Sequence, residues 1–432
     1  MSGSRNRLLA LWTHLGLQRA HVATQMAGDV IPLAEAAPER IGNLILCTPS
    51  RLDPAPFAPL SERIILVTGE SGLCAEVTAR AMPRLPHASR IVLDGYDAPG
   101  WADVIADRTD DILRIFDALA DLPPATLPAQ SGSHAGITYR IEGSGPPLVL
   151  LPFFLAPSQW DPAREALAQR FTVITLGGRH LGGVAALEDR ATAVSYRGMV
   201  RTLWDTIGVT TGASILDVGC GSGALDRMLA ARLGPGASIT ATDVNRFLLR
   251  EAETIAAEEG LAGRITFRFA NAESLPFADA TFDHAFSVTV LEECDADRAL
   301  AELFRVLRPG GRAGVIVRSI DMPQWWNLDL PPAIAAKVTV PPQSVGSAGV
   351  ADASLYPRMQ RAGFAGVRCF PSLVTLDQPD GPIWRYREDH ATSLLSESEL
   401  VQWQGLTAQA RAAGMLFQSH PMHCSVGTKP VS

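Results

Sequence analysis

The sequence predicts an α/β protein with two doubly wound sheets, and three observations carry that prediction. Short apolar runs alternate with helical stretches through residues 1–120. A stretch without helical or strand periodicity follows, and the alternation then restarts at Ala213. Strands that are apolar at every position are typical of a mostly parallel sheet that helices cover on both faces. Two such units are therefore expected along the chain.

The first unit is expected to span residues 1–182. Residues 121–133 are rich in proline and serine, which predicts a linker within this unit between segments 1–120 and 134–182. The expected strands are 20–25, 42–48, 63–68, 90–94, 136–142, 147–152 and 171–176, and the expected helices include 73–84 and 103–120.

The second unit is expected to span residues 186–432. Residues 183–192 are small and polar and precede a helix over 194–207. The expected strands are 213–218, 238–242, 265–269, 282–287 and 313–318. Residues 319–349 carry five prolines and a Gly/Ser cluster, which predicts a loop or lid within this unit, and 319–432 is expected to supply lid and substrate-binding segments.

Charge and cysteine usage exclude several classes of protein. The chain has 45 acidic and 37 basic residues and a net charge of −8, whereas a nonspecific nucleic-acid binder needs a basic surface. No apolar run approaches the ~20 residues of a membrane span. The six cysteines are scattered without C-x-x-C spacing, which fits a reducing compartment. The composition therefore predicts a soluble cytoplasmic protein.

The clearest motif is a glycine-rich loop. Residues 214–223 read S-I-L-D-V-G-C-G-S-G, so an apolar strand runs into Gly219, Gly221 and Gly223, and a helix begins near Ala224. Glycines let the backbone turn sharply beside a helix N-terminus and approach a ligand closely. Asp243 ends the next strand, where a carboxylate can accept hydrogen bonds from both hydroxyls of a ribose. The loop alone also satisfies a dinucleotide-binding pattern.

Charge favours a different ligand from a dinucleotide. Asp217 lies just before the first glycine, where it would repel a pyrophosphate but would suit a cationic amino group. At this spacing the chain resembles class I S-adenosylmethionine (SAM)-dependent methyltransferases, closest to the ubiquinone-biosynthesis-like group. Three further segments agree with the resemblance. They are Asn271-Ala272-Glu273 with Leu275-Pro276-Phe277, Phe282-Asp283 with 285–290, and Leu307 to Gly311.

The resemblance implies a SAM site and a small-molecule methyl acceptor. The implied cofactor-binding residues are Tyr196, Asp217, Gly219, Gly221, Gly223, Asp243, Val244, Asn271, Ala272 and Ser287. Asn271 stands where the family usually has Asp. Tyr196 is expected over the sulfonium, with Arg197 or Arg201 near the methionine carboxylate.

Methyl transfer from a sulfonium releases a neutral leaving group, so a base is needed only for an acceptor of high pKa. The candidates for that base are Glu292, His390 and His423. The pattern His420-x-x-His423 resembles a metal pair, but strand alternation would place these side chains on opposite faces, so no metal site is predicted.

The first unit resembles an α/β-hydrolase whose second half precedes its first. Residues 15–28 resemble the nucleophile elbow, Val67 to Glu70 the strand before the acid, and Gly95 to Pro99 the histidine loop. Residues 134–182 resemble the first strands and the oxyanion turn. The domain is either circularly permuted or a remnant of a tandem gene. Segments 1–120 and 134–182 are expected to form one sheet, whereas the remnant alternative predicts that one half packs only on the methyltransferase unit.

The catalytic residues of a hydrolase are absent from the matching positions. Gln25 stands at the nucleophile position, Gly72 at the acid position and Asp97 at the histidine position, which predicts an inactive hydrolase-like domain. Two alternatives to a methyltransferase stay open. One is a SAM-binding protein with a non-methylating or sensory role. The other is a hydrolase with displaced catalytic residues, in which Cys47 or Cys74 would be the nucleophile.

Overall fold

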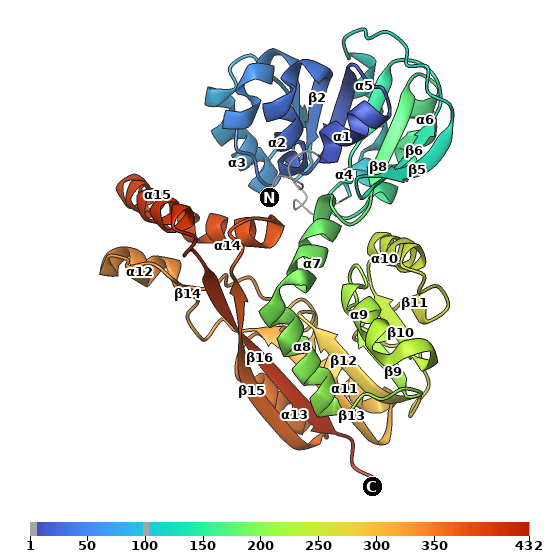
Figure 1. The fold of residues 1–432 in the computed structure, drawn as a ribbon, viewed down its shortest axis with the longest axis vertical. Coiled ribbons are helices and arrows are strands. Elements are labelled where there is room, and N and C mark those ends of the chain that lie inside the picture. The colour runs from blue at the N-terminus through green and yellow to red at the C-terminus, as the bar shows by residue number, and fades with distance from the viewer. Residues whose placement is uncertain (1–6, 98–102, 432) are drawn as a thin grey trace. The chain divides into compact units, whose positions relative to one another are not determined.

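The computed structural model describes residues 7–97 and 103–431 and divides the chain into two compact units (Figure 1). One unit is Met1–Ala185 and the other is Ala186–Ser432. Each contains one eight-stranded mixed sheet. In the described part of the chain, no helix is both long and apolar enough to cross a membrane.

The sheet of the first unit has the strand order β4-β3-β2-β1-β7-β8-β6-β5. Its strands are parallel except β6, which runs antiparallel to both β8 and β5. The strands are β1 (Ala20–Thr24), β2 (Ile41–Cys47), β3 (Ile64–Gly69), β4 (Ser89–Leu93), β5 (Gln130–His134), β6 (Ile137–Glu142), β7 (Pro147–Leu150) and β8 (Thr172–Gly177).

Helices cover both faces of this sheet, as the apolar runs predict. Leu44 packs on one face with Trp12 and Leu33, while its neighbour Ile45 packs on the other face with Phe116. The helices of this unit are α1 (Arg7–His14), α2 (Ala27–Ala36), α3 (Gly72–Ala81), α4 (Val104–Asp107), α5 (Thr109–Asp117) and α6 (Asp161–Ala168), with 3-10 turns at Pro38–Arg40, Ala55–Arg63, Met82–Arg84 and Pro157–Trp160.

The structure places the two segments of the first unit in one sheet, because β1 pairs in parallel with β7. Two expectations need correction. The predicted linker 121–133 ends in the edge strand β5, whose polar residues are held by backbone pairing with β6. The predicted helix 103–120 is interrupted at Arg108, so it forms α4 and α5 and ends at Asp117.

The sheet of the second unit has the order β11-β10-β9-β12-β13-β16-β14, and β15 also pairs with β16. Strands β9 to β13 are parallel, and β16 runs antiparallel between β13 and β15. The strands are β9 (Ser214–Val218), β10 (Ser238–Asp243), β11 (Ile265–Phe269), β12 (Phe282–Val288), β13 (Leu307–Arg318), β14 (Trp325–Trp326), β15 (Ala365–Leu376) and β16 (Gln418–Thr428).

Two hydrophobic clusters lie on the two faces of this sheet. Ile215 packs with Leu203 and Leu229 in one cluster, and Leu216 packs with Leu303 in the other. The helices are α7 (Gly182–Thr192), α8 (Val194–Ile207), α9 (Ala224–Leu233), α10 (Arg246–Glu258), α11 (Ala296–Val306), α12 (Pro332–Val338), α13 (Leu355–Arg361), α14 (Pro382–Ser393) and α15 (Glu397–Ala412), with a 3-10 turn at Gly234–Gly236.

Three features of the second unit differ from the sequence-based expectation. Residues 183–192 are helical, within α7. The turn expected at 307–311 lies inside β13, where the pairing register jumps and Gly310 takes a φ of 81°. The segment expected to hold the lid also contributes the long strands β15 and β16, which complete the sheet.

Candidate functional site

The glycine loop follows β9 and accepts no larger side chain. Gly219, Gly221 and Gly223 have φ values of 86°, 55° and 71°, in the left-handed region that favours glycine. A Cβ on Gly219 would lie 2.0 Å from Cγ2 of Val290, and one on Gly223 would lie 2.9 Å from the ring of Phe267. Both backbone conformation and space therefore require glycine here.

Asp243, the last residue of β10, is fixed against this loop. Its Oδ2 accepts a hydrogen bond from Gly221 N at 2.9 Å, and its Oδ1 accepts one from Asn245 N at 2.8 Å. Burial raises the pKa of Asp243, and these backbone hydrogen bonds oppose the rise. A carboxylate oriented in this way can accept two hydroxyl hydrogen bonds from one sugar.

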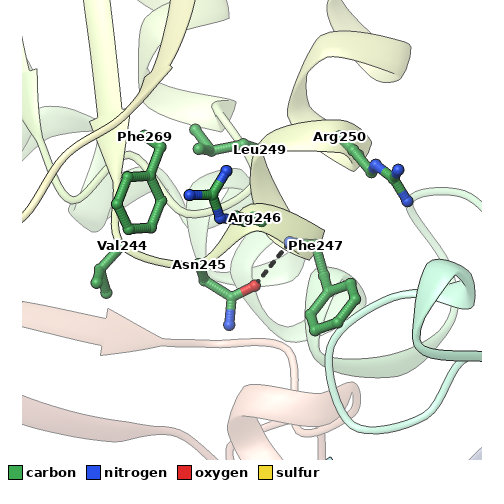
Figure 2. A pocket seen from close by; sticks show the side chains of 7 residues that line it. All are labelled: Val244, Asn245, Arg246, Phe247, Leu249, Arg250 and Phe269. Atoms are coloured by element: carbon green, nitrogen blue, oxygen red, sulfur yellow. Dashed lines mark hydrogen bonds between the residues drawn. The ribbon is translucent and has the colours of Figure 1, made fainter. Parts of the chain in front are cut away.

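A pocket of about 630 Å³ opens beside Asp243 (Figure 2). Val244 is 63% exposed at its rim, and Asn245 begins α10 by accepting hydrogen bonds from Phe247 N and Leu248 N. The Arg246 guanidinium lies 4.1 Å from the centre of the Phe269 ring. The lining residues are Val244, Asn245, Arg246, Phe247, Leu249, Arg250 and Phe269.

The remaining sequence-predicted cofactor residues adjoin this region. Ala270 N donates to Asp243 O at 3.1 Å, which places the following Asn271 and Ala272 next to β10. Asn271 is exposed and its Oδ1 accepts a hydrogen bond from Glu273 N, whereas Ala272 is buried. Ser287 is buried in β12 and donates to Val218 O at 2.7 Å. This hydrogen bond fixes Ser287 of β12 to the last residue of β9, the strand that leads into the glycine loop.

Asp217 is buried beneath the loop together with Asp226 of α9, and the two carboxyl groups interact. Burial, and then the charge of Asp226, raise the pKa of Asp217 well above its ordinary value. Burial also raises the pKa of Asp226, to about 7. Burial therefore opposes ionisation of both carboxyl groups, and their titration belongs to the pair.

This pair predicts a pH-dependent stability of the second unit. Because the folded pKa values exceed ~4, the ordinary value for an unfolded Asp, the folded state binds more protons than the unfolded state above pH ~4. The associated stability is present below pH ~4 and is lost as pH rises toward about 7. Asp217→Asn should therefore gain about 1–3 kcal/mol over the native protein by pH 7.

Thermal melts between pH 4.5 and 7.5 test this expectation. The exposed Asp329 supplies a control, Asp329→Asn, which removes the same charge from the surface. The gap between Asp217→Asn and the native protein should widen with pH, and the control should follow the native curve. Parallel curves for all three proteins would show that the carboxyl pair does not hold an extra proton.

Helix α7 carries residues of the site that sequence reasoning missed. Glu188 accepts hydrogen bonds from Ser222 Oγ at 2.6 Å and from Arg227 Nη2 at 2.5 Å, and this fixes α7 to the glycine loop. Arg190 donates to Thr289 Oγ1 at 3.0 Å and lies 5.1 Å from the Tyr196 ring centre. The polar composition of 183–192 gave no signal for these long-range contacts.

Tyr196 lies within a group of charged side chains in the second unit. It is buried, and its hydroxyl has no hydrogen-bond partner among the described residues. Burial raises the pKa of the Tyr196 hydroxyl, Arg190 opposes the rise, and the charges of Asp217 and Glu292 add to it. The charges of Asp217 and Glu292 thus both act on the Tyr196 hydroxyl. Arg201 is exposed, and Arg197 is half-buried.

The three candidate bases differ sharply in environment. Glu292 is fully buried, and its Oε1 accepts a hydrogen bond from Arg318 N at 2.7 Å. Burial raises its pKa, and Arg318 opposes the rise. The Nε2 atom of His390 lies 3.1 Å from the backbone oxygen of Val340. Of these two groups, only Glu292 contributes to the pKa shift of Tyr196.

His423 belongs to a separate cluster. Its Nε2 lies 2.8 Å from Asp321 Oδ1 and 3.3 Å from Ser319 Oγ. Burial opposes ionisation of Asp321, yet hydrogen bonds from Ser319 and His423 lower its pKa to about 2. The Nδ1 atom of His420 lies 3.4 Å from Oε1 of Gln418 instead. The two histidines therefore have different partners, as strand alternation predicts for side chains on opposite faces of the sheet. Residues 7–97 and 103–431 contain no group of three or more side chains that could hold a metal ion.

In the first unit, Gln25 occupies the turn after β1 and is held by hydrogen bonds. Its Nε2 donates to both oxygens of Thr48 at 3.2 Å, and its Oε1 accepts from Phe154 N at 3.1 Å. Gly72 and Asp97 are neighbours, since a Cβ on Gly72 would lie 3.3 Å from Asp97 O. Ala98 and Pro99 of the expected histidine loop lie outside the described residues.

The two cysteines considered as displaced nucleophiles are buried thiols. Burial raises the pKa of Cys47 to about 12 and raises that of Cys74 as well. Cys74 also donates a hydrogen bond to Thr48 O at 3.2 Å. Because the thiolate is the reactive form, neither side chain is activated as a nucleophile.

Known proteins resemble part of this chain. A family profile described as a methyltransferase domain, Methyltransf_25, matches residues 215–311. The O-methyltransferase resE of Aspergillus sclerotiorum is 35% identical over 208 residues, which cover 47% of this chain and 73% of that protein. The ubiquinone/menaquinone biosynthesis C-methyltransferase UbiE of Hahella chejuensis is 37% identical over 139 residues, covering 31% of this chain and 55% of that protein.

A solved geranyl diphosphate methyltransferase in complex with SAM is similar with a TM-score of 0.33 and 20% identity, and it covers 57% of this chain and 91% of that one. The extent of the resE match shows the family of this chain. The chain belongs to the SAM-dependent methyltransferases, and its cofactor is SAM. The chain spans about half the length of the UbiE relative that it matches.

Proposed function

We propose that this protein transfers the methyl group of SAM to a small-molecule acceptor in the second unit, 186–432. The observation that carries the proposal is the loop of three left-handed glycines hydrogen-bonded to Asp243 through Gly221 N. That arrangement supplies a close backbone approach and an oriented carboxylate at one place. All six cysteines are free thiols, which suits a cytoplasmic enzyme.

In this proposal Asp243 binds the ribose, while Val244, Asn271 and Ala272 line the adenine side. Gly219, Gly221 and Gly223 let the methionine portion approach the backbone, and Ser287 supports the loop. Asp217 lies on the side of the cationic amino group. Tyr196 covers the sulfonium, and Arg190 of α7 replaces Arg197 and Arg201 as the partner of the methionine carboxylate, because it lies against Tyr196.

The reaction is an in-line displacement in which the acceptor atom bonds to the methyl carbon as the bond from carbon to sulfur breaks. The sulfur leaves as a neutral thioether, so much of the rate can come from holding the two reactants together without water. SAM supplies the methyl group when bound. In this proposal Glu292 takes a proton from an acceptor that needs deprotonation; its full burial and the effect of its charge on the Tyr196 hydroxyl support this role.

Isothermal titration calorimetry with SAM, S-adenosylhomocysteine (SAH) and NAD tests the cofactor assignment. SAM and SAH should each bind once per chain. NAD should not bind measurably, because the acidic side chain of Asp217 beneath the glycine loop does not favour a pyrophosphate there. Tight NAD binding would instead support a dinucleotide-dependent enzyme. Transfer of a labelled methyl group from SAM to a small-molecule extract would separate turnover from cofactor sensing alone.

For the first unit, 1–182, we propose a degenerate, circularly permuted α/β-hydrolase-like domain. If β5 to β8 are numbered 1 to 4 and β1 to β4 are numbered 5 to 8, the order across the sheet is 1-2-4-3-5-6-7-8. Strand 2 of this numbering is β6, which runs antiparallel to its neighbours. This single sheet, built from both segments, supports the resemblance to an α/β-hydrolase, and Gln25 follows β1 where the resemblance expects the elbow. The side-chain oxygen of Gln25 accepts a hydrogen bond from Phe154 N. In an active hydrolase a backbone N–H of this type would donate to the oxyanion of the reaction intermediate.

Gln25→Ser should leave esterase activity at background. The substitution restores a hydroxyl, but Gly72 and Asp97 still leave the serine without an acid and a histidine. Hydrolysis of 4-nitrophenyl esters measures the esterase activity of Gln25→Ser, with the native protein and Gln25→Ala as references. Labelling of the native protein by a serine-directed fluorophosphonate within residues 1–185 would overturn the inactive assignment.

A further inference from the structure

Helix α14 presents an arginine on its buried face. Trp384, Arg387 and Ala391 lie one helical turn apart and are 1%, 6% and 0% exposed. Trp384 and Ala391 pack in the same hydrophobic cluster as Tyr196. A charged side chain in such a position is expected to have an ionic partner, because burial removes its water.

The guanidinium of Arg387 has no such partner in residues 7–97 and 103–431. Its Nε is buried without a hydrogen bond, and the guanidinium carbon lies 5.7 Å from the centre of the Tyr386 ring. The contrast is Arg227, which is 5% exposed. Arg227 forms ion pairs with Glu188 and Glu259 and donates to Ser222 O.

The charged groups that act on Arg387 are also mainly positive. Burial lowers the pKa of Arg387 to about 10, Tyr386 opposes this, and the charges of Arg318 and Arg190 lower it further. Burial, followed by the charges of Arg387 and Arg190, lowers the pKa of His420 well below its ordinary value. Among the described residues no ion pair reaches Arg387, and the charges that act on it most strongly after Tyr386 are those of other arginines.

This region adjoins the proposed cofactor site. Ile383 N, at the start of α14, donates to Asp189 Oδ2 at 3.3 Å, so α14 contacts α7 next to Arg190. Arg190 and Tyr196 also retain buried polar atoms, Nε and Oη, without partners among the described residues. Glu292, the carboxyl group of this cluster, accepts a hydrogen bond from Arg318 N through Oε1, and its Oε2 is buried without a partner among the described residues.

We propose that Arg387 binds an oxyanion group, a carboxylate or a phosphate, of the methyl acceptor. The inference rests on the proposed function, because it places the acceptor beside Tyr196 and the SAM methyl group. Arginine is suited to this role, since its planar guanidinium donates two parallel hydrogen bonds to either group. The acceptor is thus an anionic small molecule, and its charge completes the buried site.

Calorimetry on the full chain saturated with SAH tests the proposal with benzoate, phenyl phosphate and neutral benzamide as probes. At least one anion should bind saturably, and benzamide should bind at least tenfold more weakly. Tighter binding of benzoate would indicate a carboxylate acceptor, and tighter binding of phenyl phosphate would indicate a phosphorylated one. Absence of saturable binding by both anions, or equal binding of benzamide, would overturn the proposal.

Arg387→Met removes the charge and should weaken binding of the preferred anion about tenfold to a hundredfold. Arg387→Lys should lose less, because it keeps the charge but not the two-pronged donor. The matched control is Arg385→Gln, an exposed arginine on the same helix, which should bind like the native protein. An unchanged anion affinity in Arg387→Met would contradict the assignment.

Two further readouts separate this proposal from its alternatives. Arg387→Met should bind SAH with native affinity; a loss of SAH affinity would mean that Arg387 serves the cofactor instead. Without ligand, Arg387→Met should melt at or above the native temperature, since it removes an unpaired buried charge. A clear fall in melting temperature would indicate a structural role. If SAH does not bind the native protein, the proposed function itself fails.

Discussion

Gly219→Ala should destabilise the second unit by about 2–5 kcal/mol and abolish measurable SAM binding. Alanine at a left-handed backbone position costs about 1–2 kcal/mol, and overpacking typically adds 1–3 kcal/mol. Both apply here, because φ is 86° and the new Cβ would lie 2.0 Å from Cγ2 of Val290. Urea denaturation, followed by tryptophan fluorescence, would measure the loss.

Gly260→Ala is the matched control for this substitution. Gly260 also has a left-handed φ, 71°, but a Cβ there would meet no atom within 4 Å. It should therefore show only the conformational penalty of about 1–2 kcal/mol and retain SAM binding. Equal effects of the two substitutions would mean that close packing of the loop against Val290 is not required.

Asp243→Ala should weaken SAM binding about tenfold to a hundredfold. The substitution removes charge-assisted hydrogen bonds to the ribose, worth about 1.5–3 kcal/mol, and it also releases Gly221 N and Asn245 N. Asp243→Asn keeps the shape and one acceptor oxygen, so it should lose less. Calorimetry measures all three proteins, and unchanged affinity in Asp243→Ala would refute the ribose assignment.

The parts of the structure that the sequence predicts well are determined locally. The apolar runs of β1, β2 and β3 are buried on both faces, so their composition identifies them without knowledge of their neighbours. The glycine loop is local in the same sense. Its left-handed backbone and the helix after it follow from residues adjacent in the chain.

The parts that the sequence did not predict depend on distant partners. Strand β5 is a polar edge strand whose order comes from backbone pairing with β6. Strand β16 contains a proline, Pro421, yet it is buried between β13 and β15. The role of α7 depends on Glu188 meeting Ser222 and Arg227. Nothing near Arg387 in the sequence signals that its guanidinium is buried without an ion pair among the described residues.

Hydrogen–deuterium exchange with and without SAM tests the central claim most directly, because it locates the cofactor without a substitution. SAM binding at the glycine loop should slow exchange in residues 217–223 and in 243–250, with added protection in the part of α7 that contacts the loop. The exchange of residues 20–48, around Gln25, should not change. Protection confined to the first unit, or none under saturating SAM, would contradict the account.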